Sequence, residues 1–300
     1  MREEDLNGLK NKYIPRNMII TKISGGLGNQ MFQYATGRAV ALNNKTELKL
    51  NLSSYPDLKY GRHYSLNVFK VNAVIASQEE IKKLRPPENF IAKKSPKITR
   101  LLSMCKSTYI NEVVGGGVIP TGKKELYLDG YWQNEKYFRD YRTQICKDFT
   151  LKTGLSQRAI KLLVNIRKTN SISLHIRRGD YVKRGVGTCS TQYYQRAIDL
   201  IIKRISKPIF YIFSESDGIN WAKSKLKFAN VPFYVNGKDY EDLTLMSNCK
   251  HNIVANSSFS WWGAWLNENP KKIIVAPDPW FNHRKTDNIP HDWFKVPKES

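Results

Sequence analysis

The sequence predicts an α/β protein whose C-terminal half is a Rossmann-like, doubly wound parallel sheet and whose N-terminal half is less regular and opens with a strand–loop–helix unit. Two observations lead to this prediction. From residue 171 onward, short runs rich in β-branched and aromatic residues alternate with helical segments, which is typical of parallel βαβ units with both sheet faces covered. Near the start of the chain, residues 18–30 read as a strand, a glycine-rich turn and the start of a helix. A chain of 300 residues has room for one large domain or two ordinary ones.

The N-terminal half begins with the apolar strand "MIITKI" and the turn "SGGLGNQ", after which a helix is expected to start near Gln30. Residues 45–111 are irregular and predict short strands and one helix near 77–84. The stretch "LYLDGYWQNEKYFRDY" predicts a strand that ends at 130–131, followed by a helix from about Asn134.

A further helix is expected over 157–168, with Ser156 as its N-cap. Its expected apolar face consists of Ile160, Leu163, Val164 and Ile166. The strands expected after it are 171–176, 209–214, 232–235, 252–256 and 272–276. The helices expected between them are 191–205, 218–226, 240–247 and 258–266.

A net charge of +23 is the strongest compositional signal. Such a charge attracts nucleic acid, an anionic membrane face or phosphorylated small molecules, and it does not choose among them. The basic residues are scattered, with one local cluster at Lys93, Lys94, Lys97, Arg100 and Lys106. A solvated basic surface is the simpler interpretation, and a membrane-facing or anion-collecting patch is the alternative.

The cysteine pattern argues against a zinc site and a disulfide scaffold, because Cys105, Cys146, Cys189 and Cys249 lie far apart and form no C-x-x-C pair. We expect reduced thiols. The sequence contains no run of about 18 apolar residues, and the polar N-terminus lacks the apolar core of a signal peptide. A cytoplasmic protein is therefore expected.

Three of the expected strands end in side chains suited to binding an anion. The residues at the end of the first are His175, Arg177, Arg178 and Asp180, those at the end of the second are Ser214, Glu215 and Asp217, and those at the end of the fourth are Asn256, Ser257, Ser258 and Ser260. Because ligands of open parallel sheets collect outside the carboxyl ends of the strands, we expect these groups to meet. Arginine forks and helix N-termini both bind phosphate oxygens, so a diphosphate is the expected ligand. The sequence has neither a P-loop nor a G-x-G-x-x-G fingerprint.

Four segments of the chain together resemble a known enzyme family. The segments "GGLGNQMFQYATGRA", "GYWQNEKYF", "HIRRGDYV" and "NSSFSWWGAWL" are similar, in order and approximate separation, to the motif set of the GDP-L-fucose-dependent α-1,2-fucosyltransferases of glycosyltransferase family 11. The resemblance spans roughly residues 18 to 282, and four motifs in register are far more specific than any one of them.

The resemblance implies a GT-B-like fold with two facing Rossmann-like domains, no metal or other cofactor, and inversion at the fucose anomeric carbon. The expected division is an N-terminal extension (1–17), an acceptor-side domain (18–165) and a nucleotide-sugar-binding domain (166–300). The implied reaction moves L-fucose from GDP-β-L-fucose to the 2-hydroxyl of a terminal galactose. A different acceptor or linkage is the alternative within the family.

The same resemblance implies roles for individual residues. Arg177 should be the chief diphosphate ligand, with His175 and Arg178 shaping its pocket. The rest of the implied donor site comprises Gly28, Asn29, Gln30, Ser214, Glu215, Asp217, Asn256, Ser257, Ser258 and Ser260. The loop "FSESDGINW" is about two residues longer than the F-S-D-D-x-x-W pattern of relatives, which leaves open whether Glu215 or Asp217 takes the acidic position.

A base must take the proton of the acceptor hydroxyl, unless the proton leaves late to phosphate or water. Asp180 is the first candidate, His175 the second, and Glu215 or Asp217 the third. Asp180 could instead cap a helix or pair with Arg178, and His175 could be a packed, hydrogen-bonded side chain.

Aromatic residues suggest where an acceptor sugar binds. Tyr131 and Trp132, at the end of a strand in the other half, are the candidates, together with Gln33, although core packing is the alternative for both rings. Trp261, Trp262 and Trp265 have helical spacing, so core or interdomain packing is expected for them, and a sugar-stacking platform is the alternative.

The expected partners are GDP-fucose, a galactose-terminated oligosaccharide or polysaccharide repeat unit, and an anionic membrane at its inner face. A nucleic-acid-binding protein would explain the charge, but the sequence shows no zinc finger, homeodomain or RNP signature. An adhesive role for the tripeptide Arg178-Gly179-Asp180 is a weak alternative, because the tripeptide follows an expected buried strand.

Overall fold

The computed structural model describes residues 17–55, 63–85, 108–113, 117–183, 185, 187–230, 232–281 and 288–299. They form two compact units. The first consists of Met1–Ser24, Gln33–Gly61 and Asn72–Trp132, and the second of Gly25–Phe32, Arg62–Val71 and Gln133–Ser300. All but the last residue of the expected N-terminal extension, the basic cluster at 93–106 and Cys105 lie outside the described residues.

The first unit contains a five-stranded sheet in the order β3-β2-β1-β5-β4, and all of its pairings are parallel. Its strands are β1 (Met18–Lys22), β2 (Glu47–Asn51), β3 (Val74–Ile75), β4 (Tyr109–Asn111) and β5 (Glu125–Asp129). The apolar residues of β1 are fully buried, and Ile20 packs with Tyr109 and Tyr127 in the core of this unit. The helix α2 (Gln78–Leu84) begins with a capping box made by Ser77 and Glu80.

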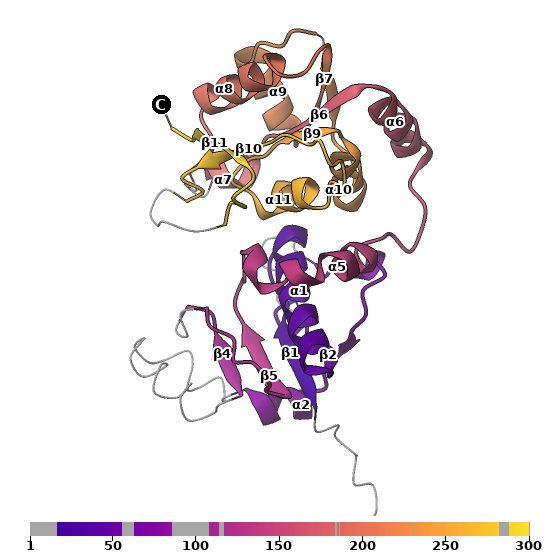
Figure 1. Ribbon diagram of the computed structural model, residues 1–300, viewed down its shortest axis with the longest axis vertical. Coiled ribbons are helices and arrows are strands. Elements are labelled where there is room, and N and C mark those ends of the chain that lie inside the picture. Colours follow the sequence, from indigo (N-terminus) through magenta and orange to yellow (C-terminus); the bar gives the residue numbers. More distant parts are fainter. Residues whose placement is uncertain are drawn as a thin grey trace, which may run out of the picture. The chain divides into compact units, whose positions relative to one another are not determined.

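The second unit contains a six-stranded parallel sheet in the order β11-β10-β9-β6-β7-β8. Its strands are β6 (Asn170–His175), β7 (Pro208–Phe213), β8 (Phe233–Val235), β9 (His251–Ile253), β10 (Ile274–Asp278) and β11 (Phe294–Pro297). Its helices are α5 (Arg142–Asp148), α6 (Gln157–Lys168), α7 (Gly179–Lys183), α8 (Thr191–Ile202), α9 (Ser216–Lys225), α10 (Asp239–Asn248) and α11 (Ser258–Trp265). Figure 1 shows α8 and α9 on one face of this sheet, and α10 and α11 on the other. The sheet is therefore doubly wound.

The helix α1 (Leu27–Asn44) contributes to both units, because its residues up to Phe32 belong to the second unit and the others to the first. It starts three residues before the expected Gln30.

Each sheet has one topological switch point. In the second unit the chain moves from β6 to β7 and β8 on one side, and then to β9, β10 and β11 on the other, so the switch lies between β6 and β9. In the first unit β2 and β3 lie on one side of β1, and β5 and β4 on the other, so the switch lies between β1 and β5. Ligands of open α/β sheets bind outside the carboxyl ends of the strands at such points.

The five strands and four helices expected from residue 171 onward are confirmed within a few residues, and the structure adds a sixth strand, β11. The helix expected from Asn134 is wrong. Two 3₁₀ turns, η3 (Glu135–Tyr137) and η4 (Arg139–Tyr141), precede α5 instead, because the Asn134 side chain accepts a hydrogen bond from the Lys136 N–H and caps a tight turn.

The helix α6 has the expected Ser156 cap, whose side chain accepts a bond from the Ala159 N–H. Its buried residues are Ala159 and Ile166, whereas Ile160 and Val164 of the expected apolar face are exposed. The prediction of that face is therefore partly wrong.

The second unit also starts earlier than the boundary at 165/166. Phe138 stacks on Trp262 at 5.3 Å between ring centroids, Phe149 packs edge-on against Trp262, and Arg142 lies over the Trp265 ring. These contacts join residues 133–150 to the second unit.

Candidate active site

Polar side chains gather at the switch point of the second unit, where β6 and β9 end side by side. β6 ends at His175 and is followed by Arg177 and Arg178, while β9 leads through Asn256 to the first turn of α11. The parallel pairing of β6 with β9 and with β7 brings the ends of these three strands side by side. Glu215, which follows the neighbouring strand β7, completes the group.

Arg177 is positioned by its neighbours. Its Nη1 donates to Oε1 of Glu215 at 2.6 Å, and its guanidinium carbon lies 5.3 Å from the centre of the Tyr181 ring. The side chain is 25% exposed, so a ligand can reach it. An added Cβ at Gly179 would lie 2.5 Å from Oε2 of Glu215, so the glycine leaves room for this carboxylate. Of the two acidic residues left open by the sequence, Glu215 is the one that contacts Arg177, and Asp217 lies exposed in the first turn of α9.

Arg178 is directed differently, because its guanidinium lies over the Trp221 ring of α9 at 4.7 Å. A cation–π contact of this kind orients the side chain without using its hydrogen-bond donors. Asp180 lies in the short helix α7, and its side chain lies outside the described part of the structure.

His175 is buried with 5% exposure, and among the described residues its Nδ1 has no hydrogen-bond partner. Burial, and then the nearby positive charge of Arg177, lower the pKa of His175 to about 3. The ring packs against Phe259 at 5.6 Å between ring centroids. At neutral pH the imidazole is uncharged, and it is a very weak base.

Three other expected donor residues make structural bonds. The Ser214 hydroxyl donates to the carbonyl of Ile176 at 2.9 Å. Asn256 Nδ2 donates to the Gly187 carbonyl at 2.7 Å, and the Ser260 hydroxyl donates to the carbonyls of Ala255 and Ser257. These bonds fix the exits of β6, β7 and β9. Ser257 is the N-cap residue of α11, and its side chain makes no capping hydrogen bond. The first N–H groups of an α-helix have no intrahelical acceptor, so they are available to an anion.

The glycine-rich segment 25–32 packs on the first turn of α11. An added Cβ at Gly28 would lie 2.5 Å from the backbone of Ser258 and Phe259, and the Gly28 carbonyl accepts a bond from Trp262 Nε1. Asn29 Oδ1 accepts bonds from the Ser258 hydroxyl at 2.7 Å and from Gln133 at 2.8 Å. Motifs more than 200 residues apart are therefore brought into contact, and Gly28 has a packing role.

Gln30 is fully buried. Its side chain donates to the carbonyls of Gly25 and His63 and accepts from the Ser65 N–H, so it holds two loops together. The expectation that Trp261, Trp262 and Trp265 lie in the core is confirmed, since their exposures are 0%, 0% and 4%.

The expected acceptor residues lie at the switch point of the first unit. Gln33 is 1% exposed and bonds to Ser24 and Gly130. Trp132 is fully buried, whereas Tyr131 is 50% exposed. Of these three residues, Tyr131 is the one that a ligand can contact.

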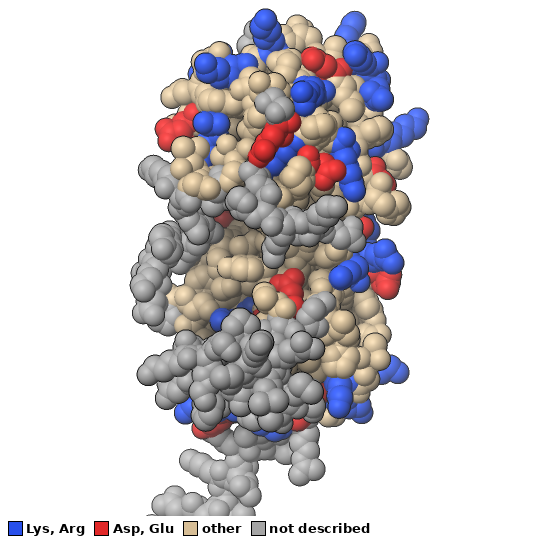
Figure 2. Space-filling model, turned by 90° about the vertical axis from the view of Figure 1, so that its left-hand side faces the viewer, with Lys and Arg blue, Asp and Glu red and all other residues tan. Residues whose placement is uncertain are grey.

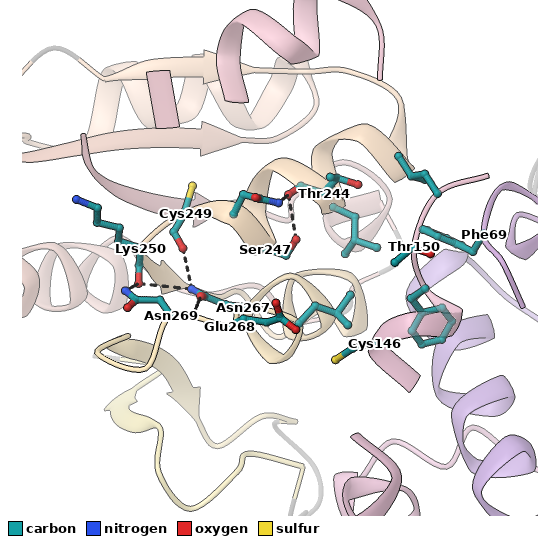
Figure 3. A pocket seen from close by; sticks show the side chains of 15 residues that line it. Phe69, Cys146, Thr150, Thr244, Ser247, Cys249, Lys250, Asn267, Glu268 and Asn269 are labelled. Carbon is teal, nitrogen blue, oxygen red and sulfur yellow. Dashed lines mark hydrogen bonds between the residues drawn. The ribbon is translucent and has the colours of Figure 1, made fainter. Parts of the chain in front are cut away.

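A separate cavity of about 490 Å³ lies in the second unit before β9. Figure 3 shows its polar wall, where Asn267 Nδ2 points at Cys249 and donates to its carbonyl at 2.8 Å, and Asn269 Nδ2 donates to the carbonyl of Lys250, also at 2.8 Å. The cavity lies at the amino end of β9, so it is distinct from the switch-point site at the carboxyl end of that strand. The Asn267 and Asn269 amides already donate to backbone carbonyls of the chain.

Basic side chains are scattered over the face that Figure 2 shows, with acidic side chains between them. This arrangement agrees with a solvated basic surface. Within the described residues, no group of three or more His, Cys, Asp or Glu side chains could hold a metal ion. None of the helices in those residues has the length and apolarity needed to cross a bilayer.

Sequence reasoning missed the aromatic supports of the site. These are Tyr181 beside Arg177, Trp221 under Arg178, Phe259 beside His175, and Tyr194, whose hydroxyl donates to the His175 carbonyl. Tyr181 and Phe259 stand within the recognised motifs, so they could have been considered. Trp221 and Tyr194 lie on helices whose packing only the structure reveals.

Comparisons with known proteins show the family to which this chain belongs. A family model described as "Glycosyl transferase family 11" matches residues 7–296. An alpha-1,2-colitosyltransferase of Escherichia coli is 35% identical over 94% of this chain and 100% of that protein. The O-antigen biosynthesis glycosyltransferase WbnK of Escherichia coli is 32% identical over 91% of this chain and 99% of that protein.

More distant similarities extend to animal proteins and solved structures. Galactoside 2-alpha-L-fucosyltransferase Sec1 of Mus musculus is 25% identical over 85% of this chain and 66% of that protein. The structure of NodZ alpha-1,6-fucosyltransferase co-crystallized with GDP has a TM-score of 0.50 at 12% identity, covering 82% of this chain and 91% of that one. This likeness confirms the α/β, GT-B-like fold class. With the family model matching almost its whole length, the chain belongs to glycosyltransferase family 11 and is a glycosyltransferase.

Proposed function

We propose that this enzyme transfers L-fucose from GDP-β-L-fucose to the 2-hydroxyl of a terminal galactose, with inversion and without a metal ion. The observation that carries the donor site is the position of Arg177, a reachable guanidinium that follows β6 at the β6–β9 switch point. A guanidinium, with its parallel N–H donors, and the free N–H groups of a helix N-terminus are both suited to binding a diphosphate.

The reaction is a single displacement. The oxygen of the galactose 2-hydroxyl forms a bond to the anomeric carbon, the bond from that carbon to the β-phosphate oxygen breaks, and its electron pair stays on the diphosphate. Negative charge therefore grows on the leaving group. We assign the stabilisation of that charge to Arg177 and the amides of α11, which is the task that a metal ion performs in other enzymes.

The hydroxyl proton must go to a base, and we propose Asp180, three residues after Arg177. His175 is a poor alternative because its pKa of about 3 makes the imidazole a weak base. We assign His175 to hydrogen bonding instead, since its Nδ1 has no partner among the described residues and it stands two positions before Arg177. Glu215 is engaged with Arg177 and is proposed to orient it.

GDP-colitose is a second candidate donor, which the 35% identity to an alpha-1,2-colitosyltransferase favours. Colitose is fucose without its 3-hydroxyl, so the two donors present the same diphosphate and differ in one hydrogen-bonding group. A site that binds that hydroxyl rejects the donor lacking it by several orders of magnitude, whereas a site that ignores it accepts both.

The acceptor is proposed to be a galactose-terminated oligosaccharide or polysaccharide repeat unit, the class suggested by relatives named for O-antigen biosynthesis and galactoside transfer. We further propose a cytoplasmic enzyme that contacts the anionic inner face of the membrane, where its net charge of +23 would favour association.

The test is a transfer assay with the purified chain, EDTA, a panel of galactosides and either GDP-fucose or GDP-colitose. The proposal predicts a product with an α-1,2 linkage by NMR, and a larger kcat/KM for GDP-fucose. Preference for GDP-colitose would reassign the donor. Hydrolysis of both donors with no galactoside product would contradict the proposal that galactosides are the acceptors. Loss of activity in EDTA would contradict the proposal that the enzyme needs no metal ion.

A further inference from the structure

The turn after β5 in the first unit has an unusual backbone. Trp132 adopts a φ of 54°, a conformation that residues with large side chains rarely take. In this backbone conformation the Trp132 side chain is completely buried, and the preceding Tyr131 side chain is 50% exposed. The turn stands at the carboxyl end of β5, beside the end of β1, and therefore at the switch point of this sheet.

Glu112, which follows β4, holds this turn. Its Oε2 accepts bonds from the Tyr131 N–H at 2.7 Å and from the Trp132 N–H at 2.9 Å. Two N–H groups converging on one carboxylate oxygen form charge-assisted bonds, which are stronger than bonds between neutral groups. An added Cβ at Gly130 would lie 2.4 Å from the Glu112 Cβ and 2.8 Å from its Oε2, so only glycine admits the carboxylate here.

Gln33 holds the same turn from the other side. Its Nε2 donates to the Gly130 carbonyl at 3.0 Å and to the Ser24 hydroxyl at 3.1 Å, and its Oε1 accepts from the Ser24 N–H at 2.9 Å. The exits of β1 and β5 are thus tied together by one buried amide. The backbone that carries Tyr131 is fixed by Glu112 and Gln33 together.

We propose that Tyr131 is the surface on which the acceptor sugar stacks, and that Glu112 is the positioning residue that presents it. A half-exposed tyrosine offers a flat apolar face with a hydroxyl at its tip, which matches a pyranose with C–H groups on its faces and hydroxyls at its rim. A rare backbone conformation kept by three side-chain hydrogen bonds at a ligand-binding edge indicates a functional site. The assignment rests on the proposed function, because it names the acceptor as the ligand.

The test compares Tyr131→Ala and Glu112→Ala with the conservative variants Tyr131→Phe and Glu112→Gln. Glu79→Ala, which removes an exposed glutamate from α2 of the same unit, is the control. Each protein is first checked for folding by its urea midpoint. The KM for the galactoside, the KM for the donor and the donor hydrolysis rate without acceptor are then measured.

We expect both alanine variants to raise the acceptor KM about tenfold or more. The donor KM and donor hydrolysis should be unchanged, and the phenylalanine and glutamine variants should stay close to wild type. The double alanine variant should be no worse than Tyr131→Ala, because Glu112 acts through Tyr131. An unchanged acceptor KM in Tyr131→Ala overturns the proposal. Equal losses of transfer and donor hydrolysis in Glu112→Ala and Glu112→Gln overturn the positioning role.

A binding measurement separates this inference from the proposed function. Saturation-transfer NMR with a galactoside and no donor reports acceptor contact directly. A wild type that binds galactoside through Tyr131 and yet transfers neither sugar contradicts the proposed function and supports the stacking site. A wild type that transfers fucose while Tyr131→Ala binds the galactoside equally well contradicts the stacking site alone.

Discussion

Arg177 is oriented before any ligand binds, because Glu215 and Tyr181 hold its guanidinium. An oriented fork can meet two phosphate oxygens at once and loses little conformational freedom when it does so. The motif "HIRRGDYV" is what singles out this arginine from the 49 basic residues of the chain, and its role as the diphosphate ligand stays a prediction. Its partner could not be chosen from the sequence, since Glu215 and Asp217 stand in one loop and only the side-chain positions distinguish them.

Replacing Arg177 should therefore disable transfer. Removing one donor that stabilises developing charge typically costs about 2.7–4 kcal/mol of barrier, so Arg177→Ala should lower kcat by about 10²–10³-fold. Arg177→Lys should not restore the rate, because an ammonium lacks the planar fork. Steady-state kinetics check this, with Arg139→Ala as the control for an exposed arginine of the same unit. Turnover close to wild type in either Arg177 variant would contradict the assignment.

The buried His175 should make stability depend on pH. Its pKa is about 3 in the folded protein, against an ordinary value of 6.5, so the unfolded chain binds a proton that the folded chain excludes. The resulting stability is complete above the ordinary pKa and is lost as the pH falls towards 3. Between about pH 7 and pH 5 the free energy of unfolding should fall by about 2 kcal/mol more in wild type than in His175→Asn. Urea unfolding at the two pH values measures this, and an identical fall in both proteins would exclude His175 as the cause.

At the scale of elements, the site depends on the contact between segment 25–32 and α11. The chain packs the Gly28 backbone against the Ser258 and Phe259 backbone and secures it with the bond from Trp262 to the Gly28 carbonyl. This contact fixes the first turn of α11, whose amides are proposed to bind the diphosphate. The glycines of "SGGLGNQ" suggest a backbone that approaches a ligand, and for Gly28 the close neighbour is another part of the chain.

A side chain at position 28 should therefore destabilise the second unit. Gly28→Ala places a Cβ 2.5 Å from backbone atoms that cannot move aside locally, so we expect a loss of about 1–3 kcal/mol in the free energy of unfolding. Gly154→Ala is the matched control, because its added Cβ meets nothing within 4 Å. Urea titrations of both variants check the prediction. Equal stabilities would show that the contact does not constrain the segment.

A helix or strand can be predicted from the sequence when its local residue pattern is strong. Strands such as β6 and β7 and caps such as Ser156 have strong local signals, and they were predicted within a few residues. The strand β11 was missed because its sequence "FKVP" is short and mostly exposed, and its identity depends on pairing with β10. The burial of α6 was partly mispredicted, since the packing of α10 selects which side of the helix is covered.

At the scale of the whole molecule, two parallel sheets each have a switch point, and each switch point carries a group of side chains that the chain holds in place. The sequence identified both groups through its motifs, because motif residues cluster at strand ends. It did not identify Glu112, whose role depends on β4 lying beside β5 in the folded sheet.

The net charge of +23 belongs to this scale, since its field extends well beyond any one residue. If the charge directs the enzyme to an anionic membrane, the protein should sediment with phosphatidylserine vesicles at low salt, and high salt should release it because screening weakens surface attraction. Vesicles of phosphatidylcholine alone are the control. Sedimentation that does not depend on salt or on lipid charge would contradict the electrostatic role.

The claim that the β6–β9 switch point binds the donor diphosphate is tested most directly by calorimetric titration of wild type and Arg177→Ala with GDP and GMP in EDTA. If the switch point binds the diphosphate, wild type should bind GDP more tightly than GMP, because the β-phosphate gains the Arg177 guanidinium and the α11 amides. This preference should largely disappear in Arg177→Ala. Tight GDP binding with an undiminished preference over GMP in Arg177→Ala would contradict the claim.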